Sequence, residues 1–200
     1  MTTPKLQYKK MKMEELIVLA QQDDMLALEE LLKKEQKNVF TTFTYLTNKR
    51  EDVSDLTQEA LLRVAKNLKS LKNPANFKSW LNQIVTHLFY DELRKRSKKP
   101  SIISIDDEND ELNPTAQLKN LIPDKKCKPQ EKCISLELED IIITEISNLP
   151  QQFKIAIILR ELQGLSYEEI AIATKSSIGT VKSRIARARL KLQENLKNYI

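Results

Sequence analysis

The stretch GLSYEEIAIATKSSIGTVKSRIARAR, residues 164–189, decides the fold of the C-terminal part of this chain. Gly164 suits the left-handed C-cap of a preceding helix. Ser166, followed three residues later by Glu169, forms a capping box that begins a new helix. A short polar run at 174–177 breaks this helix, and a second helix follows it. The spacing therefore predicts a helix-turn-helix.

The second helix of this motif is strongly basic. Six Lys or Arg residues and no Asp or Glu lie between positions 175 and 191. One apolar face is formed by residues at i, i+4, i+7 and i+11, namely Val181, Ile185, Ala188 and Leu192. The remaining surface carries Lys, Arg and small side chains, which suit the phosphates and base edges of duplex DNA. We weigh DNA binding against an ordinary solvated basic surface, and the position of the cations on the second helix favours DNA.

Composition indicates an all-α protein with an uneven charge. Only 2 of the 200 residues are Gly, and helix-favouring residues are abundant. The net charge is +5, but residues 94–99 and the last helix are basic, whereas residues 101–140 hold ten acidic residues against five lysines. Two basic lobes on either side of an acidic connector suggest two contacts along one polyanion.

The chain divides into two small helical domains joined by a flexible linker. Residues 1–98 form the first domain. One or two helices are expected at 13–35, with a weak break near residues 22–24, and further helices at 36–50, 53–68 and 77–96. Residues 99–135 contain four prolines without sustained periodicity, as linkers do. Residues 136–200 form the second domain, which ends in the helix-turn-helix.

Metal, redox and membrane roles find little support. Cys127 and Cys133 lie in the connector, and His87 is the single histidine, so no set of four zinc ligands is present. A local disulfide and two incidental thiols remain alternatives for the cysteines. No apolar run approaches the ~20 residues that span a bilayer, and no signal peptide is recognisable. We expect a cytoplasmic protein without metal or cofactor that is not an enzyme.

One face of the helix predicted at 53–68 is polar apart from a single leucine. Four residues share it, spaced i, i+3, i+4 and i+7: Asp55, Gln58, Glu59 and Leu62. The opposite, core face holds Val53, Leu56, Ala60, Leu61, Val64 and Leu68. An exposed leucine alone needs no explanation. Beside two carboxylates and an amide, it fits a protein-docking patch with an apolar anchor and a polar rim.

The loop at 69–76 and the helix after it form a third candidate region. Aromatic, amide and basic side chains are mixed there: Phe77, Lys78, Trp80, Asn82, His87, Tyr90 and Arg94. Aromatic residues beside cations can stack unpaired bases and hold their phosphates. Alternatively, the apolar members of this helix are mainly core, and His87 is an ordinary boundary histidine.

Five segments carry a resemblance to a known family. They are DLTQEALLRVAKNL at 55–68, FKSWLNQIV at 77–85, DELRKR at 91–96, LPQQFKIAIILRELQGLSYEEIA at 149–171 and GTVKSRIARAR at 179–189. In this order they resemble the bacterial sigma-70 family, specifically the small two-domain extracytoplasmic-function (ECF) sigma factors. The resemblance covers about residues 13–98 and 136–200, which is most of the chain.

The resemblance implies a factor that directs promoter-specific transcription initiation, for a stress or envelope response. It places Asp55, Gln58, Glu59 and Leu62 in the helix that docks on core RNA polymerase. It implies recognition and melting of the −10 element by Asn73, Asn76, Ser79, Trp80, His87, Arg94 and Arg96. It implies binding of the −35 element by Thr180, Lys182, Ser183, Arg184, Ala186, Arg187 and Arg189.

The expected partners follow from the same resemblance. They are core RNA polymerase, promoter DNA and an anti-sigma factor, with the chain acting as a monomer within the holoenzyme and without membrane insertion. Two other classes of protein remain as alternatives, a stand-alone helix-turn-helix regulator and a decoy that binds polymerase without recognising promoters. Co-elution with core polymerase and opening of a promoter bubble discriminate the three.

Overall fold

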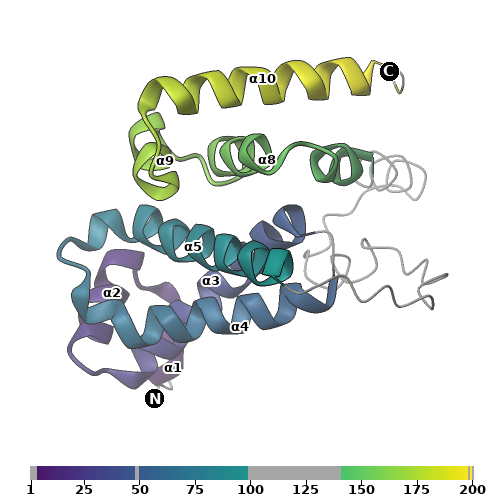
Figure 1. Cartoon of the computed structure of the whole chain (residues 1–200). Helices are drawn as coiled ribbons and strands as arrows, with labels where there is room; N and C mark the ends of the chain where they lie inside the picture. Colours follow the sequence, from purple (N-terminus) through teal and green to yellow (C-terminus); the bar gives the residue numbers. More distant parts are fainter. Residues whose placement is uncertain (1–3, 48–49, 99–140, 198, 200) are drawn as a thin grey trace, which may run out of the picture.

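A computed structural model describes residues 4–47, 50–98, 141–197 and 199, and every regular element among them is helical (Figure 1). The first half comprises α1 (Pro4–Lys10), α2 (Met13–Gln21), α3 (Met25–Leu46), α4 (Arg50–Asn67), the short turns η1 (Leu68–Ser70) and η2 (Pro74–Asn76), and α5 (Phe77–Lys98). The second half comprises a helix at 141–147, α8 (Gln151–Ile157), η3 (Ile158–Leu162), α9 (Tyr167–Thr174) and α10 (Ile178–Leu196). The predicted all-α class with two helical domains is confirmed.

The predicted linker at 99–135, with Cys127 and Cys133, lies outside the described residues. The domain bounds that follow from it therefore stay predictions. Within the described ranges, no helix combines the length and apolar character that crossing a membrane requires.

The helix predicted at 36–50 is not a separate helix but part of the longer helix α3. The chain breaks at 22–24, as expected, where Asp23 has a φ of 68°. Asp24 then caps α3, its carboxylate accepting hydrogen bonds from the N–H groups of Leu26 and Ala27. From there one helix continues to Leu46, because the residues around position 35 include no Gly or Pro that would end it.

The loop between α4 and α5 is anchored to α2. The Gln21 side chain donates hydrogen bonds to the carbonyls of Leu68 and Leu71, at 2.9 and 2.7 Å. The Asn73 side chain accepts from the N–H of Ala75 and so caps η2. These bonds satisfy the backbone of a segment that lacks a longer helix. They hold the start of α5 in a defined place.

The predicted helix-turn-helix is present. Gly164 has a φ of 64°, which suits the left-handed cap. Ser166 and Glu169 form the predicted capping box. Lys175 adopts a left-handed conformation in the turn, and Ser177 caps α10 by accepting from the N–H of Thr180.

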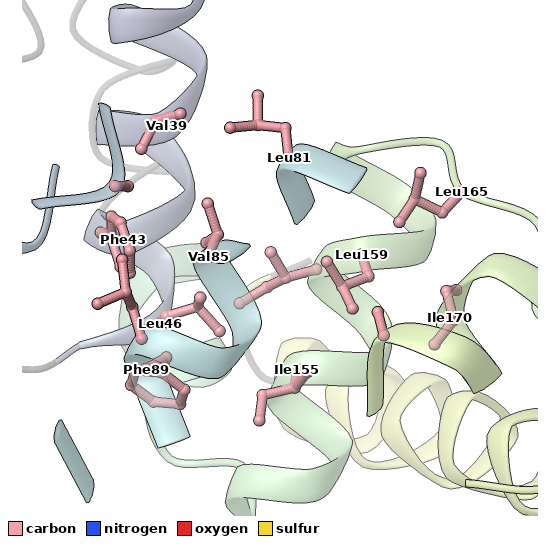
Figure 2. Close-up of a cluster of buried hydrophobic side chains, with 14 of the residues drawn as sticks. Val39, Phe43, Leu46, Leu81, Val85, Phe89, Ile155, Leu159, Leu165 and Ile170 are labelled. Atoms are coloured by element: carbon pink, nitrogen blue, oxygen red, sulfur yellow. The ribbon is translucent and has the colours of Figure 1, made fainter. Parts of the chain in front are cut away.

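The two halves pack against one another along α5 and α3. In Figure 1, α5 lies between α4 and the helix-turn-helix, and α9 contacts it directly. Figure 2 shows the apolar side chains at this junction, where residues of α3 and α5 lie beside residues of α8, η3 and α9. Those labelled are Val39, Phe43, Leu46, Leu81, Val85, Phe89, Ile155, Leu159, Leu165 and Ile170, and all are buried. The hydrophobic core is therefore continuous between the halves.

Candidate polymerase-docking and DNA-binding surfaces

The predicted stripe on α4 is a real surface feature. Asp55, Gln58 and Glu59 are exposed, and Leu62 leaves 52% of its surface open to solvent. The opposite face is the core, as expected, with Leu61 half-buried and the other five predicted members buried. The helix therefore presents one apolar side chain within an otherwise polar, solvent-facing row.

A charged groove continues from this stripe to α5. It is lined by acids from both helices and by three cations: Asp52, Asp55, Glu59, Asp91, Glu92, Arg63, Arg94 and Lys95. Arg63 donates to Glu59 at 2.8 Å and lies 3.9 Å from Asp91, so it joins the two walls. Sequence reasoning missed Arg63, although its i+4 spacing from Glu59 signals an ion pair.

Two arginines that were predicted to bind the −10 element differ in how far they are exposed to solvent. Arg96 is only 35% exposed, because it pairs with Asp52 of α4 and with Glu92, the latter at 3.2 Å. Arg94 is 72% exposed and lies 3.3 Å from Asp91. Exposed pairs of this kind exchange readily with solvent and with competing anions. Arg94 is therefore placed to reach a phosphate, whereas Arg96 ties α5 to α4.

The residues predicted to bind the −10 element at and after the loop at 69–76 differ in their exposure to solvent. Asn73 and Asn76 are exposed at η2, where Asn73 keeps its amide N–H groups after capping. Ser79 is buried. Trp80 is half-buried, with its ring centroid 6.0 Å from that of Phe77. The tryptophan thus packs beside Phe77 at the start of α5, while Ser79 does not face solvent.

His87 is half-buried on α5. Its ring lies near the turn of the helix-turn-helix, and its Nε2 atom is buried without a hydrogen-bond partner in the described part of the chain. Burial lowers the pKa of His87, and the nearby cations Lys175, Arg63 and Arg94 lower it further against the opposing effect of Asp91. The neutral imidazole is the form that this site favours.

This environment predicts an acid-sensitive contribution to stability. The pKa of His87 is lowered in the folded protein. As the pH falls below the ordinary value of 6.5, the imidazole is therefore protonated more readily in the unfolded chain than in the folded one. The free energy of unfolding should therefore fall between pH 7.5 and 5.5, and His87→Gln should fall less over this range. Urea denaturation at several pH values measures both slopes, and equal slopes would contradict this origin.

The outer face of α10 carries the residues that were predicted to bind DNA. Val181, Ile185 and Ala188 are buried. The free face shows the exposed side chains of Lys182, Ser183, Ala186 and Arg187, with Thr180 half-buried in the first turn. Within the described residues, no hydrogen bond or ion pair holds Arg187. Arg187 can therefore enter a groove without first breaking such a contact, whereas the Ser183 hydroxyl donates to the carbonyl of Thr180 at 2.9 Å.

Comparison with known proteins decides the family. Residues 31–99 match the model of Sigma-70 region 2, and residues 139–192 match that of Sigma-70, region 4. The ECF RNA polymerase sigma-E factor of Haemophilus influenzae is 32% identical over 184 residues, which cover 90% of this chain and 93% of that protein. The chain belongs to the ECF sigma factors. It is not an enzyme: it directs core RNA polymerase to promoters to initiate transcription.

Further relatives agree with this family. The sigma-E factor of Escherichia coli strain K12 is 35% identical over 139 residues, which cover 69% of this chain and 70% of that protein. Among solved structures, the sigma factor RpoE in complex with the anti-sigma factor NepR, from Bartonella quintana, has a TM-score of 0.62. It is 25% identical to this sigma factor and covers 84% of this chain and 96% of its own.

Two candidate phosphate ligands of the sigma factor are engaged within region 4. The Arg184 guanidinium donates to Ser176 Oγ and to Gln152 Oε1, both at 2.8 Å. The Nε of Arg189 donates to Glu161 at 3.1 Å, and this pair raises the pKa of Arg189. Each arginine must exchange these partners before it binds a phosphate.

The aromatic ring of Tyr167 is a feature that sequence reasoning missed. Arg160 lies over it at 4.7 Å, and Lys182 approaches it at 5.6 Å from the ring centroid. A cation over a ring face is stabilised by the quadrupole of the ring. Tyr167 therefore orients the ammonium group of Lys182 at the start of α10. No local sequence spacing indicates this contact, because it joins the two helices of the motif.

Nothing in the described residues resembles a metal site. No group of three or more His, Cys, Asp or Glu side chains is gathered there in ligand geometry.

Proposed function

We propose that this sigma factor docks on core RNA polymerase through the α4 stripe, with Leu62 as its apolar anchor. The exposed leucine within the row of Asp55, Gln58 and Glu59 is the observation that supports this assignment most. Residues that dominate interfaces are apolar or aromatic anchors ringed by polar contacts. The groove toward Arg63 and Asp91 extends the charged rim of the same surface.

We further propose that the outer face of α10 reads the −35 element. Lys182, Ser183, Ala186 and Arg187 would face the bases, while Arg184 and Arg189 would hold phosphates after exchanging their internal partners. The exposure of the first four supports their role, whereas hydrogen bonds hold Arg184 and an ion pair holds Arg189 in the free protein. Base contacts choose the sequence, and phosphate contacts position the protein.

For the −10 element, we propose that the loop at η2 captures an unpaired base. Asn73 and Asn76 carry exposed amide groups that can read a base edge, and Trp80 packs beside Phe77 where the loop ends. Arg94, which is exposed on α5, is the proposed phosphate ligand. Ser79, His87 and Arg96 would act through packing and ion pairs, because the structure gives them buried or paired positions.

The regulatory setting is a fourth proposal. The likeness to sigma-E factors supports a role in an envelope stress response, exercised as a monomer within the holoenzyme in the cytoplasm, where polymerase works. The complex of RpoE with NepR supports control by an anti-sigma factor. The matches to both sigma regions disfavour the two alternatives, a stand-alone regulator and a decoy.

Reconstitution tests this function. Purified protein should co-elute with core RNA polymerase and then open a bubble at promoters that transcript mapping after overexpression identifies. Permanganate footprinting detects the unpaired thymines of that bubble. A stand-alone regulator would neither co-elute nor open DNA, and a decoy would only co-elute. Upstream sequences shared by the induced transcripts would supply both promoter elements for the experiments below.

A further inference from the structure

The side chain of Lys182 is exposed in the first turns of α10. Within the described residues, no hydrogen bond or ion pair holds it. A lysine ammonium is a compact point charge on a flexible aliphatic stem, so an unrestrained lysine reaches phosphates and bases alike. The structure does give this lysine one directed neighbour, the ring of Tyr167, whose centroid lies 5.6 Å from Nζ. How selectively Lys182 binds therefore depends on this ring.

The ring of Tyr167 is held firmly in place. Tyr167 is the first residue of α9, whose start is fixed by the capping box of Ser166 and Glu169. The ring is half-buried and packs against the hydrophobic core. The guanidinium of Arg160 lies over it at 4.7 Å and also donates to the carbonyl of Leu165 at 2.7 Å. The ring is therefore a fixed surface against which a neighbouring cation can rest.

The backbone of Lys182 is fixed as well. Val181, the residue directly before it, is completely buried. Ser177 caps α10 by accepting from the N–H of Thr180 at 3.1 Å. The buried face of α10 packs on α9, so the Cα of Lys182 has a defined position relative to the ring. Only the aliphatic stem of the lysine is left to move, and the quadrupole of the ring attracts its charged end.

A ring restrains a cation in a different way from an acceptor oxygen. It attracts the ammonium but accepts N–H groups only weakly, so the donors stay available to a second partner. Arg184 and Arg189 differ in this respect, because their N–H groups already donate to side-chain oxygens. Lys182 is thus oriented and can still bind without exchanging a hydrogen bond.

We propose that Tyr167 is a positioning residue for −35 recognition, which holds the Lys182 ammonium so that it donates to a guanine edge. This inference rests on the proposed base-reading role of Lys182. In the major groove guanine presents the acceptors N7 and O6 side by side, whereas adenine presents N7 beside its N6 amino donor. A restrained ammonium that meets both acceptors distinguishes the purines, while a mobile one binds the nearest phosphate. The ring thus converts a general attraction for DNA into a preference for one base.

Replacement of the ring tests this role in the full-length sigma factor bound to core polymerase. The base pair that Lys182 reads is the one at which Lys182→Ala changes the preference in a panel of −35 sequences. At that base pair, Tyr167→Leu should lower the ratio of affinities for guanine over adenine about threefold, the size of an exposed cation–π contact. The slope of affinity against salt should stay the same, because no charge is lost. Tyr167→Phe keeps a ring and should keep the preference.

A double variant separates positioning from a structural role. In a Lys182→Ala background, Tyr167→Leu should no longer change the base preference, since no ammonium is left to orient. Exchange of the guanine for 7-deazaguanine removes the N7 acceptor and should weaken the wild type more than Tyr167→Leu. Ile172→Ala truncates another large side chain of α9, which is 62% exposed, and should behave as wild type. Circular dichroism and thermal melting confirm that each variant is folded.

The proposal would be overturned if Tyr167→Leu weakened binding equally for all bases, or if its effect on the preference persisted without Lys182. An equal loss of preference in Tyr167→Phe would also overturn it, since that result would assign the effect to the hydroxyl group and not to the ring. Failure of the proposed function is distinguishable, because Lys182→Ala itself would then leave the preference among −35 sequences unchanged.

Discussion

Exchange of Leu62 for alanine together with Glu59 for lysine is expected to weaken binding to core RNA polymerase by about 2 kcal/mol or more. Leu62 is the exposed apolar member of the α4 stripe, so truncation removes the anchor. The lysine reverses the charge of a rim residue and separates it from Arg63, which Glu59 now holds at 2.8 Å. Titration of labelled sigma factor with core polymerase measures the loss.

The control for this variant is Leu26→Ala on α3, which truncates another exposed leucine of the same domain. It should leave polymerase affinity unchanged. Binding of the separate C-terminal domain to −35 duplex should be unaffected, since α4 is not part of that domain. A folded double variant with wild-type affinity in this titration would remove the docking assignment.

The second large effect is expected at α10. Lys182→Ala and Arg187→Ala should change the preference among −35 sequences, each lost base contact costing ~1–3 kcal/mol. Both side chains lie on the exposed face, where Tyr167 orients the lysine. Arg184→Ala and Arg189→Ala should instead weaken binding to all sequences alike and flatten its dependence on salt.

A panel of −35 duplexes, each titrated at several salt concentrations, separates these two classes of variant. The matched comparison is Arg187→Lys, which keeps the charge but loses the planar fork that binds a guanine edge at two points. It should retain the salt slope and lose part of the discrimination. If all four alanine variants behaved alike across the panel, the division between base-reading and phosphate-holding residues would be wrong.

Local structure and the faces of individual helices were predictable from sequence. The capping box of Ser166 and Glu169 is formed by neighbouring residues, so its signal is complete within one turn. The apolar face of α10 and the polar stripe of α4 follow from helical periodicity alone. The order of motifs along the chain then indicated the family, which the comparisons confirmed.

The ends of helices were harder to predict where no Gly, Pro or capping residue marks them. The division of α3 into two helices was wrong because polar residues at 33–38 reduce the hydrophobic periodicity without ending the helix. Polar composition is compatible with an exposed helix surface, and only Gly, Pro or a cap would have marked an end.

Tertiary structure alone decided which candidate side chains are available. Arg96 pairs with Asp52 across 44 residues, and Gln163 bonds Thr42 across 121. The burial of His87 Nε2 likewise depends on the packing of the helix-turn-helix near α5. Periodicity tells which face of a helix is apolar, but not which other helix covers it. The sequence by itself therefore determined the helices, their faces and the family, whereas the pairing of faces, set by long-range packing, determined which charges are free.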